Sequence, residues 1–165
     1  ALSISSLPKK MVIVGGGYIG LEMGSVWSRL GTEVQVIEFL DHITPGMDKE
    51  ISNEFLKILK KQGIKFYLNT KVEKITKNKN SVIIETSNKE GDKKDFESDV
   101  VLISVGRKPN TKNLNLEKIG VELDKKDKIK VNKNFETTSK NIYAIGDVIE
   151  GPMLAHKAEE EGIAS

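Results

Sequence analysis

Cysteine is absent from this sequence of 165 residues. Its absence excludes disulfides, thiolate nucleophiles and cysteine-ligated zinc sites within these residues. The only two histidines, His42 and His156, lie far apart in the sequence, so we predict no metal site.

Long apolar runs and a strong charge imbalance are also missing. No apolar stretch in the sequence approaches the roughly 20 residues that a membrane-spanning helix needs. Lysine and arginine number 26 against 24 aspartate and glutamate residues, which gives a formal net charge of +2. Because this balance produces no strong positive field, we expect neither nucleic acid nor a membrane among the partners.

The apolar residues that are present gather in short blocks, at residues 11–14, 34–37 and 100–105. Such blocks predict buried strands. The length fits one domain, since about 100 to 150 residues is the commonest domain size. We therefore expect a single domain over residues 1–165, and we expect it to be a segment of a longer protein because the helical stretch from Leu154 ends without a capping residue.

The first part of the chain has the order strand, glycine turn, helix, strand. A strand at residues 10–14 leads into Gly15-Gly16-Gly17, and apolar residues then recur at helical spacing as far as Leu30. Gly31 is the expected C-terminal glycine of that helix, and a second strand follows at residues 33–38. A connection of this kind joins parallel strands with a right-handed crossover.

The remaining pattern predicts an α/β fold: a Rossmann-like parallel sheet with helices, in which an antiparallel three-stranded meander replaces one crossover. A last strand and a helix follow an irregular polar stretch. The expected elements are a helix closed by Gly63, a strand at 65–68, the meander strands 72–76, 81–86 and 94–97, a buried strand at 99–105, a strand at 141–145, and a helix from Leu154.

A dinucleotide-binding pattern, G-x-G-x-x-G, is formed by Gly15, Gly17 and Gly20 between the first strand and its helix. Gly15 permits the sharp turn, Gly17 lets a pyrophosphate approach the backbone, and Gly20 lets helix and strand pack closely. The phosphates would meet unpaired amides at the helix N-terminus.

Glu38 adds specificity to this pattern, because it ends the second strand about 20 residues beyond the glycines, where a carboxylate can accept ribose hydroxyls. An acid there disfavours a 2′-phosphate, and neither Phe39 nor Leu40 supplies a guanidinium for it. NAD is therefore expected rather than NADP. The alternative is a glycine turn and a surface glutamate in a domain that binds no nucleotide.

Five strings extend the pattern into a family resemblance: GGGYIGLEMGSVWSRLG, VIEF, LISVGRKPN, YAIGDV and GPMLAHKAEEEG. They resemble the pyridine nucleotide-disulfide oxidoreductases, and in combination they are similar to the dihydrolipoamide dehydrogenases within that family. The resemblance covers essentially the whole chain. It implies a central NAD-binding segment, with residues 1–9 as a linker from an FAD domain and residues 141–165 as a returning part of that domain.

The resemblance also implies cofactor contacts. Those to NAD would come from Gly15, Gly16, Gly17, Tyr18, Ile19, Gly20, Leu21 and Glu22, with Glu38 at the ribose, Val72 at the adenine and Gly106 on the nicotinamide side. Those to FAD in the full-length enzyme would come from Asp147, Met153, Leu154, Ala155 and His156.

Several of these residues have a second reading from the residue pattern alone. Glu22 suits an exposed helical position, and Gly106 and Asp147 suit turns. Tyr18 departs from the aliphatic residue of many dihydrolipoamide dehydrogenases, and it is either a lid over the flavin or a packing aromatic.

In the whole enzymes of this kind, dihydrolipoamide reduces an active-site disulfide, the dithiol passes electrons to FAD, and the reduced flavin gives hydride to NAD. The resemblance places the redox cysteines and the acid–base pair outside this segment, so we expect no catalytic residue here and no activity from the segment alone. The alternatives are another flavoprotein disulfide reductase, an NADH oxidase, or a stand-alone nucleotide-binding module.

The resemblance implies a homodimer that docks onto 2-oxo acid dehydrogenase complexes through their lipoyl domains. It implies the mitochondrial matrix or another organelle as the location in a eukaryote, and the cytoplasm in a bacterium.

Overall fold

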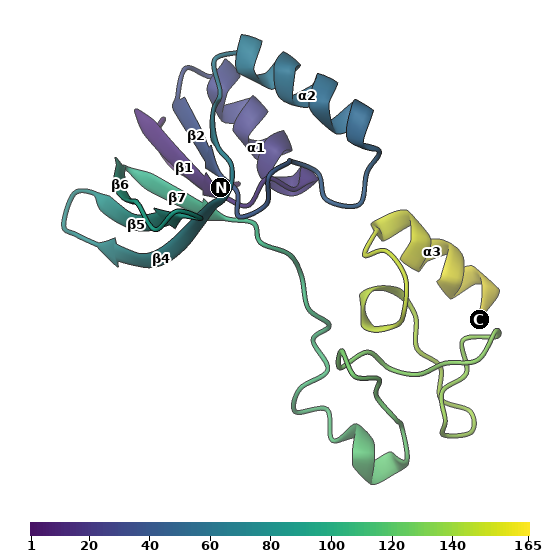
Figure 1. Cartoon of the computed structure of the whole chain (residues 1–165). Helices are drawn as coiled ribbons and strands as arrows, with labels where there is room; N and C mark the ends of the chain where they lie inside the picture. Colours follow the sequence, from purple (N-terminus) through teal and green to yellow (C-terminus); the bar gives the residue numbers. More distant parts are fainter. The chain divides into compact units, whose positions relative to one another are not determined.

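The computed structural model describes residues 1–165 and divides them into two compact units, Ala1–Gly106 and Arg107–Ser165 (Figure 1). We expected one domain, with a returning part from residue 141, whereas the division of the structure falls after Gly106. The assignment of residues to an NAD domain and an FAD domain stays a prediction.

The first unit is built on a four-stranded sheet in the order β3-β2-β1-β7. All neighbouring strands are parallel, which confirms the predicted parallel sheet. Its strands are β1 (Lys10–Val14), β2 (Glu33–Ile37), β3 (Lys65–Tyr67) and β7 (Val100–Ile103). Neighbouring residues of a strand point to opposite faces. The apolar runs of β1 and β2 therefore supply side chains to both faces of the sheet.

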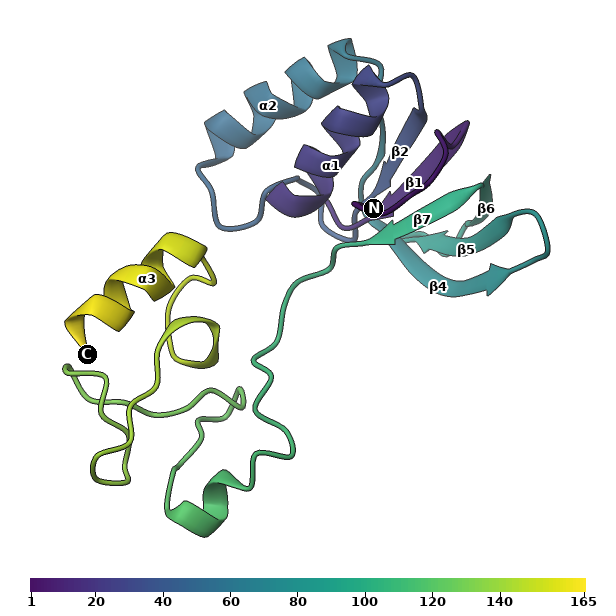
Figure 2. The same cartoon turned by 180° about the vertical axis from the view of Figure 1, so that it is seen from behind.

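Helices cover one face of the sheet and the meander covers the other (Figures 1 and 2). On the helical face, α1 (Tyr18–Arg29) and α2 (Lys49–Lys61) enclose a core that includes Met11, Ile13, Leu21, Val34, Val36 and Leu59. On the other face, the meander strands β4 (Thr70–Lys77), β5 (Val82–Asn88) and β6 (Lys93–Ser98) contribute Ile84 and Phe96 to a core with Val12 and Ile37. The predicted antiparallel meander is thus confirmed.

Local sequence signals end the two long helices where the pattern predicts. Gly31 has φ +105° and Gly63 has φ +94°, a region of backbone conformation that favours glycine. Each glycine amide donates to a carbonyl three residues earlier, that of Ser28 or Lys60. At the start of α2 the Asp48 side chain accepts from two helical amides, as an N-cap should.

The second unit contains little regular structure. It has the short helices η1 (Leu116–Ile119) and η2 (Gly146–Val148), the expected helix α3 (Ala155–Ala164), and a small core of Val121, Ile129, Ala144 and Ile149. The strand predicted at 141–145 is wrong: Tyr143 makes only an isolated bridge to Glu136. An apolar run becomes a strand only where a partner strand pairs with it, and this unit holds isolated bridges alone.

The structure has no helix of the length and apolarity that crossing a bilayer requires. It also has no group of three or more His, Cys, Asp or Glu side chains placed to hold a metal ion.

Candidate functional site

The glycine loop between β1 and α1 is shaped by close packing at two of its glycines. Gly15 has φ +106°, and a Cβ atom there would lie 2.5 Å from the carbonyl oxygen of Ser104. A Cβ atom on Gly20 would lie 2.5 Å from both the Gly15 carbonyl oxygen and Ser104 Oγ. Side chains at either position would push the loop away from β7, which agrees with the turn and packing roles predicted for these glycines.

Gly17 behaves differently, because a Cβ atom added there would meet no atom within 4 Å. It precedes the first residue of α1 with φ −76°, and no side chain caps the helix N-terminus. The first turn of α1 also holds no acidic residue. The backbone at Gly17 is therefore open to an anion, and the unpaired amides and the helix dipole would attract one.

Gly16, which lies between Gly15 and Gly17, is held through both of its backbone polar groups. Its amide donates to Glu38 Oε2 at 2.6 Å, and its carbonyl accepts from the Thr44 amide at 2.8 Å. A phosphate would therefore bind the amides that follow Gly16 rather than the Gly16 amide itself.

The Glu38 carboxylate lies against the loop, with the residue only 8% exposed. Its second oxygen, Oε1, accepts from the Leu40 amide at 2.8 Å. A carboxylate offers about four lone-pair sites, so each oxygen keeps one acceptor position beyond these bonds. The residues present thus fit a ribose whose hydroxyls donate to Glu38 and whose diphosphate lies at Gly17.

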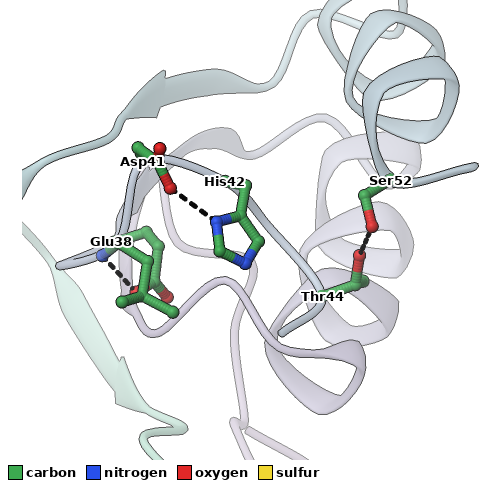
Figure 3. Close-up of polar contacts among 6 residues, drawn as sticks. Glu38, Asp41, His42, Thr44 and Ser52 are labelled. Atoms are coloured by element: carbon green, nitrogen blue, oxygen red, sulfur yellow. Dashed lines mark hydrogen bonds and ion pairs between the residues drawn. The ribbon is translucent and has the colours of Figure 1, made fainter. Parts of the chain in front are cut away.

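Three residues that support this site were not singled out by the sequence. The Thr44 and Ser52 hydroxyls, both buried, form a hydrogen bond of 2.7 Å that joins the segment after β2 to α2 (Figure 3). Ser104 Oγ donates to the carbonyls of Val14 and Gly15 at 3.1 and 3.2 Å. Their only local signal is a hydroxyl side chain beside a strand or helix end, which is common in loops.

The first turn of α1 presents some of its predicted contact residues and buries another. Tyr18 is 53% exposed and Ile19 37% exposed, and Glu22 is exposed as well. Leu21 is 1% exposed and packs into the core below the helix. Leu21 can therefore meet a cofactor only through its backbone, and Tyr18 is not a core aromatic in this unit.

The two remaining predicted NAD contacts lie on different elements. Val72, on β4, packs against the core between the meander and the sheet. Gly106 follows β7 with φ +118°, and nothing lies within 4 Å of a Cβ atom built on it. Its conformation fits the turn expected at this strand end.

The predicted FAD contacts belong to the second unit. The Asp147 carboxylate accepts from the Arg107 guanidinium at 2.9 Å. Leu154 precedes α3 as its N-terminal flanking residue, while Ala155 and His156 open the helix and are exposed. No side chain caps this helix either, so its first amides are open at the positions expected to face a flavin.

A separate open groove of about 740 Å³ lies between the end of β3 and the β5–β6 hairpin. Its lining includes Tyr67, Asn69, Lys94 and Phe96. None of the predicted cofactor contacts lines this groove. It is therefore distinct from the glycine-loop site.

Known proteins that are similar to this chain are named as more than one kind of enzyme. The chain is 54% identical to the mitochondrial dihydrolipoyl dehydrogenase of Pisum sativum over 165 residues, which cover 99% of this chain and 33% of the relative. It is 53% identical to a leghemoglobin reductase of Glycine max over 165 residues, 99% of this chain and 32% of the relative. This chain spans about a third of the length of each.

Solved structures include the HOCl-induced flavoprotein disulfide reductase RclA of Escherichia coli in its Cu(II) complex. It matches with a TM-score of 0.88 and 31% identity, covering 99% of this chain and 37% of that one. The family model described as pyridine nucleotide-disulphide oxidoreductase matches residues 1–162. The chain therefore belongs to the pyridine nucleotide-disulphide oxidoreductase family.

Proposed function

We propose that the first unit binds NAD(H) at the glycine loop, as the nicotinamide-nucleotide site of a dihydrolipoyl dehydrogenase. The observation that carries this proposal is the juxtaposition of an open Gly17 with the Glu38 carboxylate, which is bonded to the neighbouring Gly16 amide at 2.6 Å. The loop offers amides for a diphosphate, and the carboxylate offers acceptors for the adjacent ribose.

The expected contacts follow from this arrangement. The diphosphate would lie at residues 17–20, the ribose at Glu38, the adenine near Val72, and the nicotinamide side near Glu22 and Gly106. Glu22 supports this orientation because it is exposed one turn into α1. In the whole enzyme the nicotinamide ring of NAD would accept hydride from the flavin.

The second candidate ligand for the same loop is the adenosine diphosphate part of FAD. It is favoured by the same glycine–carboxylate geometry and by the flavoprotein disulfide reductase that the structure resembles. We place FAD instead at the second unit, against Asp147 and the open N-terminus of α3, with Met153 to His156. The flavin site would be completed by parts of the whole protein beyond this chain.

The activity of the whole protein is proposed as oxidation of dihydrolipoyl groups, because the relatives include dihydrolipoyl dehydrogenases at 54% identity. A leghemoglobin reductase is nearly as similar, so reduction of a haem protein is the alternative activity. The proposal includes a homodimer that serves 2-oxo acid dehydrogenase complexes. It also includes the mitochondrial location that the name of the pea relative states.

Calorimetric titration of the purified chain with NADH, NADPH, FAD and ADP tests which nucleotide it binds. We expect NADH to bind more tightly than FAD and NADPH, and we expect Glu38→Gln to weaken NADH. FAD binding that exceeds NADH binding and depends on Glu38 would assign the loop to FAD instead. Turnover of dihydrolipoamide by this chain alone would contradict the expectation that it carries no catalytic residues.

A further inference from the structure

The segment between β2 and α2 is fixed to the rest of the first unit at some of its residues, while a residue between these fixed points is exposed to solvent. The Leu40 carbonyl accepts from the Asn69 amide at 2.9 Å, and the Thr44 amide donates to Gly16. Ile43 is buried at 1% exposure. Asp41, between these fixed points, carries a side chain that is 67% exposed.

Asp41 is itself oriented by its neighbour. His42 Nδ1 donates to Asp41 Oδ1 at 2.6 Å, and because a carboxylate has no hydrogen to give, this ring nitrogen must carry the proton (Figure 3). The hydrogen bond from His42 keeps the pKa of Asp41 below its ordinary value. The negative charge is therefore fixed in position and stays on at neutral pH.

Asp41 is the third residue after Glu38, the residue proposed to hold the ribose. Asp41 directly follows Leu40, whose amide donates to Glu38 Oε1 at 2.8 Å. In dinucleotide-binding folds a 2′-phosphate is recognised by cationic residues near this acidic position. A 2′-phosphate carries a charge of about −1.5 to −2 at neutral pH, so it would meet Asp41 where it needs a cation.

We propose that Asp41, oriented by His42, is a second determinant of nucleotide specificity that repels the 2′-phosphate of NADP(H), in addition to Glu38. The inference rests on the proposed NAD(H) site. It assigns to Glu38 the recognition of ribose hydroxyls and to Asp41 the exclusion of a phosphorylated ribose.

The charged groups around Asp41 predict the sign of each effect. Besides His42, the ammonium group of Lys89, on the β5–β6 hairpin, acts on the Asp41 carboxylate. Lys89 opposes the repulsion, so its removal should strengthen discrimination against NADPH. Removal of the Asp41 charge should weaken that discrimination.

The experiment measures dissociation constants for NADH and NADPH with wild type, Asp41→Asn and Lys89→Met. We expect Asp41→Asn to tighten NADPH binding about three- to tenfold and to leave NADH within about twofold, the size of one screened charge contact. Lys89→Met should weaken NADPH about two- to threefold for the same reason. Both effects should shrink at high salt.

Three results would distinguish failure of the proposed NAD(H) site from failure of the inference about Asp41. If wild type binds neither nucleotide, the proposed NAD(H) site is wrong and this inference falls with it. If NADH binds and Glu38→Gln weakens it while Asp41→Asn leaves NADPH at the wild-type level, only the inference is overturned. Equal changes in NADH and NADPH affinity, insensitive to salt, would show that Asp41 merely shapes the loop and would also overturn it.

Discussion

The amide of Gly16 and the carboxylate of Glu38 are joined by a hydrogen bond of 2.6 Å. The residue proposed to hold the ribose therefore also holds the glycine loop in its shape. The two functions share one side chain but use different lone pairs of it. Substitution of Glu38 should consequently change both nucleotide affinity and the stability of the first unit.

Glu38→Ala is expected to weaken NADH binding by about 1.5 to 3 kcal/mol, the usual range for hydrogen bonds to a charged group. It should also lower the free energy of unfolding by about 1 to 3 kcal/mol, because the buried Gly16 amide loses its acceptor. Calorimetric titration and urea unfolding measure the two effects. Glu38→Gln is the milder variant, since its one amide oxygen can still accept a hydrogen bond from one of the two backbone amides, those of Gly16 and Leu40. NADH affinity that is unchanged in both variants would contradict the ribose role.

Gly17 and Gly20 provide a matched pair that separates binding from packing. Gly20→Ala should destabilise the unit by about 1 to 3 kcal/mol, because its methyl group would lie 2.5 Å from the Gly15 carbonyl oxygen. Gly17→Ala should stay within about 0.5 kcal/mol of wild type in stability, since its methyl group meets no atom. It should nevertheless weaken NADH at least about tenfold, or about 1.4 kcal/mol, because the methyl group would occupy the approach of the diphosphate.

Thermal unfolding and NADH titration of both variants check this pair. The opposite pattern, with Gly17→Ala unstable and NADH affinity retained, would place the diphosphate elsewhere.

Ser52→Ala is expected to lower stability by about 1 to 2 kcal/mol, since it leaves the buried Thr44 hydroxyl without its partner. The Thr44 amide also donates to the Gly16 carbonyl, so the loop should become more mobile. Faster hydrogen exchange at the Thr44 amide would show this effect. Asn53→Ala, an exposed neighbour on the same helix, should leave that exchange rate unchanged.

Much of the first unit could be predicted because its signals are local. Alternation along Met11 to Val14 sorts residues between two faces, and Gly31 and Gly63 mark helix ends by a backbone requirement. The roles of Gly15 and Gly20 follow from the strand–turn–helix context alone. These features depend on neighbours within a few residues in the sequence.

The features that could not be predicted depend on contacts across the fold. Ser104 reaches the Gly15 carbonyl over 89 positions of sequence, and Thr44 reaches Gly16 only because the segment after β2 turns back over the loop. Thr44 adopts φ +51°, which its β-branched side chain disfavours, so tertiary contacts hold it there. The run at 141–145 has the composition of a strand, but no paired strand lies beside it in its unit.

The second unit should respond to acid through Glu161. The Lys157 ammonium group, by hydrogen bonding to this carboxylate, and the Gly146 amide, which donates to it at 2.7 Å, keep the pKa of Glu161 below the ordinary glutamate value of 4.5. Because the folded pKa is lowered, the stabilisation is fully present above the ordinary value and is lost as the pH falls through the lowered pKa. Glu161 thus links α3 to the turn at Gly146 more strongly at neutral pH than in acid, because protonation removes the charge that attracts the Lys157 ammonium group and strengthens the bond from the Gly146 amide.

An NMR titration of the Gly146 amide measures this pKa directly, and we expect a midpoint below 4.5. Glu161→Gln keeps an acceptor for Gly146 but cannot titrate, so its amide signal should stay constant through the same range and α3 should exchange faster already at neutral pH. Glu159→Gln, an exposed position on the same helix, serves as the matched control, and in this variant the Gly146 amide signal should titrate as in wild type. A midpoint at or above the ordinary value, or an unchanged Gly146 titration in Glu161→Gln, would show that another group governs the acid response of this unit.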